Sequence, residues 1–286
     1  MKIADFKQAL GVDEQASWVF PGEHFSATQL NMLQVCPRQY QQRYILGRKE
    51  PPGAARVIGK AVHEGIGFRL APRIEGMPAA PLKDVAEYLH DLVWPTILDQ
   101  AETDIVWDEG QKPEDALMLA GRMIETYCKG AGERVEPSAI EREFKTLVPG
   151  VPIPLLGYVD ISQRDHRPSI DIKTTKRAQK TMKPDWILQG RIYQIAERQS
   201  IDWHVVTKQT TPQVLTGLES PALMQNWNET LIRRTEEHIA KLAWLANAYY
   251  RHFGEEEDWP ATGIAHDWRC DWCGYRNDCP AWEGLE

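Results

Sequence analysis

The amino-acid sequence predicts a protein of the α/β or α+β class, built as one main unit with a small mixed sheet and a helical insertion. The first observation is a group of short, partly alternating segments separated by Pro and Gly, as in a β-meander: "AIEREFKTLV" (139–148), "PIPLLGYVDISQ" (152–163) and "SIDIKTT" (169–175). The second is that helical patterns come before and after this group. The third is the length of 286 residues, enough for one large domain or two small ones with a substantial core.

The elements before the sheet are expected to be helices. "FSATQLNMLQV" (25–35) has Ser26 as a potential N-cap, and Gln29, three residues later, completes a capping box. Further helical patterns cover 57–70 and 82–129, the second with breaks at Pro95 and Pro113.

The elements after the meander alternate between helix and strand. Pro184 suits the first turn of a helix that runs to about residue 199. "IDWHVVTK" (201–208) is expected to be a strand, and 221–253 a long helix that Gly254 ends. The remaining tail is loop-like and rich in Trp and Cys.

Composition restricts the class of protein. The apolar and charged fractions of 42% and 26% are those of a soluble globular protein, and the net charge of −8 argues against a purely electrostatic, histone-like nucleic-acid binder. It leaves room for an enzyme with a local basic cluster. The start has no long apolar run and no segment is apolar enough to span a membrane, so a cytoplasmic location is expected (the host-cell cytoplasm if a phage encodes the chain). The five cysteines are therefore not expected to form structural disulfides.

Two acids and a lysine form the candidate site. Asp171 and Lys173 share one face of the 169–175 strand, because side chains alternate with period two. An ion pair on a surface strand would also explain them. Asp160 ends an apolar strand, and if the two strands pair, both carboxylates can hold Mg²⁺ or Mn²⁺ while Lys173 stabilises charge on a phosphate.

Three more residues are candidates. Gln189 and Tyr193 lie four apart on one helical face and offer hydrogen bonds to a phosphate or a metal-bound water, although both also suit a helix–sheet interface. His63 lies in "GKAVHEGIG" (59–67). A lone helical histidine is usually structural, but the glycines around this one would let another chain approach closely. As a ligand, its imidazole would favour Mn²⁺.

The order of these motifs resembles the RecB-like branch of the PD-(D/E)XK nucleases. The motifs are His63, Gly-x-x-Asp at 157–160, Asp-x-Lys at 171–173 and Gln-x-x-x-Tyr at 189–193. The opening "FSATQLNMLQVCPRQYQQRY" (25–44) is similar to the start of the same family, and the resemblance runs to about Pro280. Val159 precedes Asp160 where the superfamily name has Pro, which this branch tolerates.

The resemblance implies a restriction-endonuclease-like core with a central mixed sheet flanked by helices, and metal-dependent hydrolysis of DNA. It assigns His63, Asp160 and Asp171 as metal ligands and Lys173 as the catalytic lysine, with Gln189 and Tyr193 in support. Glu141 or Glu143 could add a carboxylate. The expected organisation is an N-terminal extension over 1–24 and one nuclease domain over 25–286, with a helical insertion at 70–130 and a Cys-rich segment at 254–286 that packs with Cys36.

Three cysteines near the C-terminus, Cys270, Cys273 and Cys279, have the spacing C-x₂-C-x₅-C and lack a fourth ligand. The resemblance supplies Cys36, because some members of the family hold a [4Fe–4S] cluster with one cysteine before the nuclease core and three after it. A structural Zn²⁺ suits the spacing equally well. Cys128 lies in a helical pattern and is expected to be a buried, inert thiol.

Positive residues gather near the candidate site despite the acidic total. Lys176, Arg177, Lys180 and Lys183 follow Lys173 with no acid among them, and phosphate contacts there would position a DNA strand. A second group, Arg38, Arg43, Arg48 and Lys49, is equally consistent with a solvated face. Three tryptophans near the cysteines can stack on bases or shield a cluster from water: Trp268, Trp272 and Trp282.

The predicted function is a metal-dependent DNA exonuclease, and the resemblance implies a preference for single-stranded ends. No Walker A motif is present, since "GAARVIGKA" (53–61) has the wrong glycine spacing and Ala61 where Ser or Thr is needed. A helicase, recombinase or CRISPR integrase partner is expected for work on duplexes, in CRISPR adaptation or in phage and bacterial recombination and repair. The alternatives are an inactive DNA-binding or regulatory module on the same scaffold and a structure-specific endonuclease.

Overall fold

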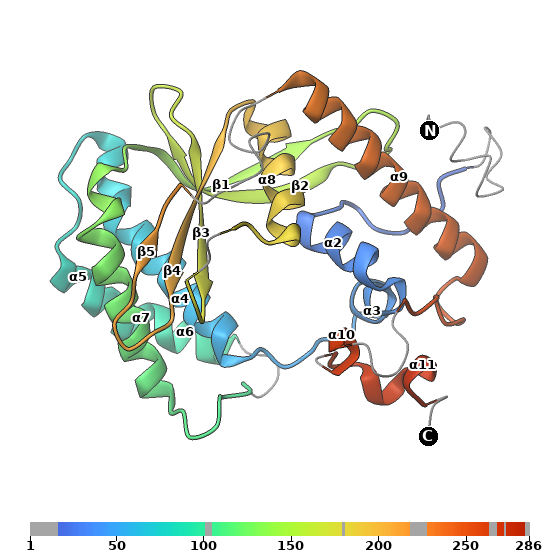
Figure 1. Cartoon of the computed structure of the whole chain (residues 1–286), viewed down its shortest axis with the longest axis horizontal. Coiled ribbons are helices and arrows are strands. Elements are labelled where there is room, and N and C mark those ends of the chain that lie inside the picture. The colour runs from blue at the N-terminus through green and yellow to red at the C-terminus, as the bar shows by residue number, and fades with distance from the viewer. Residues whose placement is uncertain are drawn as a thin grey trace. The chain divides into compact units, whose positions relative to one another are not determined.

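The computed structural model describes residues 17–100, 105–178, 181–217, 228–262, 268–271 and 273–283 (Figure 1). The chain divides into two compact units. The first comprises Met1–Glu50, Phe144–Gly157 and Glu229–Glu286, and the second Pro51–Glu143 and Tyr158–Asn228. No helix in the described part of the chain is both long and apolar enough to cross a membrane.

The helices are α2 (Ala27–Val35), α3 (Pro37–Tyr40), α4 (Ala54–Leu70), α5 (Leu82–Tyr88), α6 (Trp94–Asp99), α7 (Pro113–Cys128), α8 (Pro184–Glu197), α9 (Glu229–Phe253), α10 (Trp268–Asp271) and α11 (Pro280–Glu283). The strands are β1 (Pro137–Thr146), β2 (Leu155–Gln163), β3 (Ser169–Thr175), β4 (Ile201–Thr207) and β5 (Val214–Leu215). Short 3₁₀ or π segments occupy Gln41–Ile45, Ala71–Glu75, Leu89–Val93, Ala131–Arg134 and Arg276–Asp278.

The five strands form one mixed sheet in the order β1-β2-β3-β4-β5. β2 pairs with β3 antiparallel, β3 with β4 parallel, and β4 with β5 antiparallel. The parallel pair requires a crossover connection, and α8 supplies it between β3 and β4 (Figure 1). The predicted mixed sheet flanked by helices is confirmed.

The alternation of β3 separates a core face from a polar face. Ile170 and Ile172 belong to the main apolar core of the second unit, which also contains the inner faces of α4 and α7. Asp171 and Lys173 point to the opposite face, where Trp186 of α8 stacks on Trp203 of β4, with ring centroids 5.8 Å apart. The hydrophobic pattern therefore fixes which face of the sheet carries the polar residues.

The first unit contains the predicted capping box. Ser26 Oγ accepts a hydrogen bond from the Gln29 amide at 3.2 Å, while Gln29 Oε1 accepts one from the Ser26 amide at 2.9 Å. α2 packs against α9 within this unit. The buried Asn247 of α9 accepts hydrogen bonds from the backbone of residues 19 and 20. Gly254 ends α9 with a φ of 60°, the left-handed conformation that glycine adopts without steric cost.

The predicted break at Pro95 takes an unexpected form. The π segment Leu89–Val93 follows α5 directly, and Pro95 lies in the first turn of α6. Because the first turn of a helix does not need the missing N–H, and the wider π turn relieves the clash of the ring with the preceding backbone, the helical path continues. The second predicted break, at Pro113, coincides with the start of α7.

Gly65 is required by the contact between α4 and α7. A Cβ at this position would lie 2.5 Å from Cδ1 of the buried Ile124. We expect Gly65→Ala to lower the free energy of unfolding by about 1–3 kcal/mol through overpacking. Gly121→Ala on α7 is the matched control, since a Cβ there meets no atom within 4 Å. It is expected to be neutral or to stabilise by up to about 1 kcal/mol. Urea unfolding of both variants tests this, and equal midpoints would contradict it.

Candidate functional site

Two acids from adjacent strands converge at the centre of the site. Ile161 of β2 pairs with Ile170 of β3, so the antiparallel register, extended by one residue, brings Asp160 next to Asp171. Asp171 is fully buried, and Asp160 is 9% exposed. The Ile172 amide donates to Asp160 Oδ2 at 2.6 Å, which holds that carboxylate across the strand pair. The strands carrying the two predicted acids therefore pair, as the hypothesis required.

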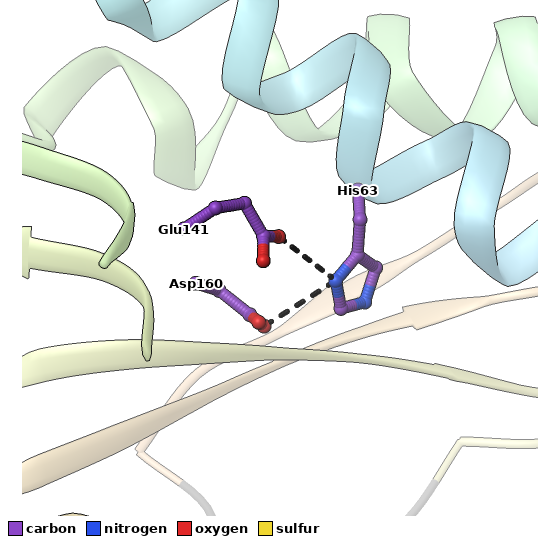
Figure 2. A group of neighbouring side chains, drawn as sticks. All are labelled: His63, Glu141 and Asp160. Atoms are coloured by element: carbon purple, nitrogen blue, oxygen red, sulfur yellow. Dashed lines mark ion pairs between the residues drawn. The ribbon is translucent and has the colours of Figure 1, made fainter. Parts of the chain in front are cut away.

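His63, Glu141 and Asp160 form a group suited to a metal ion (Figure 2). One ligand atom from each lies within 4.8 Å of the others. His63 Nδ1 is 3.5 Å from Asp160 Oδ2 and 3.9 Å from Glu141 Oε1. The three residues come from α4, β1 and β2, and their side chains point toward one another. An imidazole with two carboxylates is a donor set that divalent Mn²⁺ or Mg²⁺ accepts.

The backbone distinguishes Glu141 from Glu143, which the sequence left as alternatives. Glu141 has a φ of 47°, a left-handed conformation inside a strand, and its carboxylate turns toward His63. Glu143 instead accepts a hydrogen bond from Tyr158 Oη at 2.8 Å. The sequence contains no glycine or turn signal that would predict the change of direction at Glu141.

The Asp171–Lys173 pair adjoins this group. Lys173 Nζ lies 2.6 Å from Asp171 Oδ2 and 5.3 Å from the centroid of the Trp203 ring. Oδ1 of Asp171 is buried and has no hydrogen-bond partner within the described part of the chain. A buried carboxylate oxygen without a partner costs free energy unless a cation or proton satisfies it, so this donor set fits a divalent metal.

Electrostatic coupling shifts the pKa values of these groups. Burial disfavours the imidazolium of His63, but Asp160 and Asp171 outweigh this and raise its pKa to about 9. Burial, with the charge of Asp160, raises the pKa of Glu141 to about 7. Burial and the charge of Asp160 also raise the pKa of Asp171, although the positive charge of Lys173 opposes this. Burial acts in the same direction on Asp160, but His63 holds its pKa below the usual range. Without a metal, the site therefore retains protons near neutral pH.

α8 brings Gln189 and Tyr193 to the polar face of the sheet. Gln189 Nε2 donates to Tyr193 Oη at 2.7 Å, as their four-residue spacing predicts. Tyr193 is buried, and burial together with the charge of Asp171 raises its pKa. The phenol therefore stays protonated and able to donate a hydrogen bond.

Trp203 is the neighbour that sequence reasoning missed. The parallel register places it opposite Asp171, and its ring lies beside Lys173. The signal was present in "IDWHVVTK", but its use depends on knowing that this strand pairs with β3 and in which register.

The two predicted basic groups have different surroundings. Lys176 lies 3.2 Å from Asp108 Oδ2, Arg177 is exposed, and Lys183 Nζ lies 5.4 Å from the Trp186 ring centroid. Lys180 is outside the described residues.

In the second group, ion pairs join Arg38 to Asp258, Arg43 to Glu50, and Arg48 to Asp278. Lys49, the remaining member, also has an interaction partner. Much of the charge of the second group is therefore balanced inside the first unit.

The four predicted cluster cysteines line one pocket of the first unit. No disulfide joins Cys36, Cys270, Cys273 and Cys279, and Trp282 and Arg276 also line the pocket. The Gly274 amide donates to Glu50 Oε1 at 2.7 Å and Tyr275 Oη donates to the Arg48 carbonyl at 2.7 Å, so the C-terminal segment is held against the segment that follows Cys36.

Other predictions near this pocket have separate outcomes. Cys128 is buried in α7, and burial raises the pKa of its thiol to about 11, as expected for an inert cysteine. Trp282 stacks under the Arg276 guanidinium at 5.7 Å. Trp272 and the side chain of Trp268 are outside the described residues.

The chain is similar in sequence to one protein family and in fold to a solved structure. The sequence model of the PD-(D/E)XK nuclease superfamily matches residues 24–280. The crystal structure of a "Putative exonuclease" from Eubacterium rectale aligns with a TM-score of 0.54 and 11% identity, covering 92% of this chain and 88% of that one. A second solved structure, SSO0001, aligns with a TM-score of 0.39 and 15% identity over 98% of each chain. A search of curated proteins gives no match.

Proposed function

Since this chain belongs to the PD-(D/E)XK nuclease superfamily, whose members hydrolyse DNA with divalent metals such as Mg²⁺ or Mn²⁺, we propose that it is a metal-dependent exonuclease of the RecB-like branch. The observation that carries the proposal is the His63–Glu141–Asp160 group beside the Asp171–Lys173 pair. In this proposal the nuclease domain covers residues 25–286, with a helical insertion at 70–130.

Each residue of the site has a role in phosphodiester hydrolysis. In this proposal His63, Asp160 and Asp171 would hold the metal, and Glu141 of β1, which groups with His63 and Asp160, would add a fourth ligand. The metal, when bound, supplies a Lewis acid for the phosphoryl oxygen and lowers the pKa of the attacking water. Lys173, 2.6 Å from Asp171, presents its ammonium to the negative charge that develops on the phosphate.

Gln189 and Tyr193 support the phosphate from α8. The Gln189 amide donates to Tyr193 Oη and orients the phenol, which in this proposal donates its own proton toward a phosphate oxygen. In this proposal the positive charges of Lys176, Arg177 and Lys183, with Lys180 near them in sequence, position the strand on either side of the scissile bond. In this proposal the substrate is single-stranded DNA with a free end, which a helicase, recombinase or integrase would supply during recombination, repair or CRISPR adaptation.

The first experiment measures nucleotide release from end-labelled single-stranded DNA with Mn²⁺. The wild-type protein is expected to release nucleotides, and Lys173→Ala to lower the rate at least about 10²-fold, because one preorganised positive charge is lost at the phosphate. The circular dichroism spectrum of the variant should match that of the wild type. Equal rates in both proteins would contradict the assignment of Lys173.

A circular single-stranded substrate separates the alternatives. An exonuclease leaves a circle intact because it has no end, whereas a structure-specific endonuclease opens it. A wild-type protein that binds DNA tightly but cuts neither substrate would identify the inactive DNA-binding module.

We further propose that Cys36, Cys270, Cys273 and Cys279 hold a [4Fe–4S] cluster, with structural Zn²⁺ as the alternative. The support is that all four thiols line one pocket and that thiolates are the usual ligands of such clusters. After anaerobic purification we expect a brown protein that contains about four iron atoms per chain. Cys273→Ser should lose the iron and unfold at a lower temperature, since the cluster joins segments far apart in sequence.

Cys128→Ser is the matched control, because this cysteine lies outside the pocket and should leave the metal content unchanged. Stoichiometric zinc in place of iron would identify the Zn²⁺ alternative. A protein that holds neither metal would contradict both.

A further inference from the structure

Lys208 follows directly after β4 and did not belong to the predicted basic groups. Its amide donates to the Thr175 carbonyl at 2.6 Å, and its Nζ lies 3.3 Å from Thr174 Oγ1 and 3.4 Å from the Thr174 carbonyl. These contacts fix the lysine at the carboxyl ends of β3 and β4. The carboxyl ends of parallel strands are where ligands bind in open α/β sheets.

The same contacts connect Lys208 to the helix that carries His63. A Cβ at Gly59 of α4 would lie 3.1 Å from Thr174 Oγ1, so the strand end packs closely against this turn of the helix. Gly59 and His63 are four residues apart on one helical face, about 6 Å along the axis. The ammonium of Lys208 therefore lies near the face of α4 that leads to the candidate metal group.

Its distance from Lys173 indicates a neighbouring phosphate and not the scissile one. Lys173 pairs with Val205 in the parallel register, and Lys208 comes three residues later. At 3.3 Å per residue this places the backbones of the two lysines about 10 Å apart along the strand direction, and the odd offset places their side chains on opposite faces of the sheet. A single phosphate group is too small to contact both at that separation.

The charge around Lys208 is unbalanced. Lys176 and Lys183 repel the Lys208 ammonium electrostatically, and Asp108, which attracts it, lies 3.2 Å from the ammonium of Lys176. No ion pair in the described ranges involves Lys208 or Lys183. Burial, together with repulsion from Lys176 and Lys183, lowers the pKa of Lys208 to about 8. The excess of positive charge at this strand end favours the binding of an anion.

We propose that Lys208, together with Lys176 and Lys183, binds a backbone phosphate of the DNA strand next to the scissile phosphate. This strand-end lysine cluster deepens the proposed nuclease function and rests on it for the identity of the polyanion. The contact positions the strand and reads no base, because phosphates carry no sequence information.

Binding of a fluorescein-labelled oligothymidylate, measured by fluorescence anisotropy with EDTA, tests the proposal without cleavage. Lys208→Gln is expected to weaken binding about 5-fold at 0.15 M salt and to reduce the salt slope of log Kobs by about 0.7, the value for one lost phosphate contact on a single strand. Lys83→Gln is the matched control, since Lys83 is 84% exposed on α5 and outside the cluster. It should match the wild type.

Two more variants sharpen the test. Asp108→Asn removes the carboxylate beside Lys176 and is expected to tighten binding about 3-fold. Lys208→Arg keeps the charge, so its affinity should fall less than that of the wild type between pH 7 and pH 9, where Lys208 loses its proton.

The outcomes separate this proposal from the nuclease function. Binding that depends on Lys208 in a protein without nuclease activity supports the phosphate site and contradicts the proposed catalysis. An unchanged affinity and salt slope in Lys208→Gln, with thermal unfolding equal to the wild type, overturns the phosphate site whatever the activity. A wild-type protein that binds no oligonucleotide overturns it as well.

Discussion

Asp160→Asn is expected to reduce the rate of Mn²⁺-dependent DNA hydrolysis by about 10³-fold, equivalent to about 4 kcal/mol of transition-state stabilisation. The substitution removes the negative charge shared by the imidazole of His63 and the proposed metal. It keeps an oxygen that can accept the 2.6 Å hydrogen bond from the Ile172 amide, so the strand pair should persist. Initial rates on end-labelled single-stranded DNA measure the loss of activity, and calorimetric titration with Mn²⁺ should show at least about 10-fold weaker metal binding.

The matched control converts a nearby carboxylate outside the His63 group to an amide. Glu143→Gln also converts a carboxylate to an amide, but Glu143 bonds to Tyr158 and not to the His63 group. Its rate should stay within about 3-fold of the wild type, whereas Glu141→Gln should lose both activity and metal affinity. Equal rates for Asp160→Asn and Glu143→Gln would show that the site lies elsewhere.

The second large effect concerns the stability of the metal-free protein, which we expect to fall as pH rises from 6 to 9. The pKa of Glu141 is raised to about 7, and that of Asp171 is raised as well, so each carboxyl destabilises the fold once it ionises. The pKa of His63 is raised to about 9 in the folded protein, from about 6.5 in the unfolded chain. The protonated imidazole therefore contributes its full stabilisation of the fold below about pH 6.5, and this stabilisation is lost as pH approaches 9. All three groups bind more protons in the folded state, and stability therefore decreases with pH.

Thermal unfolding in EDTA and in excess Mn²⁺ tests this dependence. In EDTA the Tm is expected to be at least about 5 °C lower at pH 9 than at pH 6. Mn²⁺ should raise the Tm more at pH 9 than at pH 6, because protons compete with the metal for the same ligands. His63→Gln should flatten the EDTA profile. A Tm in EDTA that is constant or rises over this range would contradict the prediction.

Local periodicity was sufficient to predict several features of the site. The alternation of β3 predicted that Asp171 and Lys173 share a face, and the helical spacing in α8 predicted that Gln189 meets Tyr193. The capping box at Ser26 and the C-terminal glycine of α9 also follow from nearest neighbours in sequence. Each of these depends on residues only a few positions apart.

The features that could not be predicted depend on non-local geometry. The role of Glu141 depends on a positive φ that no residue type in β1 requires, and Trp203 reaches Lys173 only through the parallel register of β4. Lys208 and Gly59 both lie against Thr174 because two strand ends and a helix meet there, which local sequence patterns do not indicate. The π segment Leu89–Val93 likewise depends on how the Pro95 ring packs against the preceding helical turn.

β3 has a consequence for how errors in folding would appear in an assay. A slip of one residue in this strand would turn Ile170 and Ile172 toward the polar site beside α8 and turn Asp171 and Lys173 into the core formed with α4 and α7. A chain with that error would lose the apolar burial that stabilises the second unit, and it would be insoluble or proteolysed before it could be counted as an inactive enzyme. Soluble preparations should therefore have nearly uniform specific activity, and poor variants should appear as low yield.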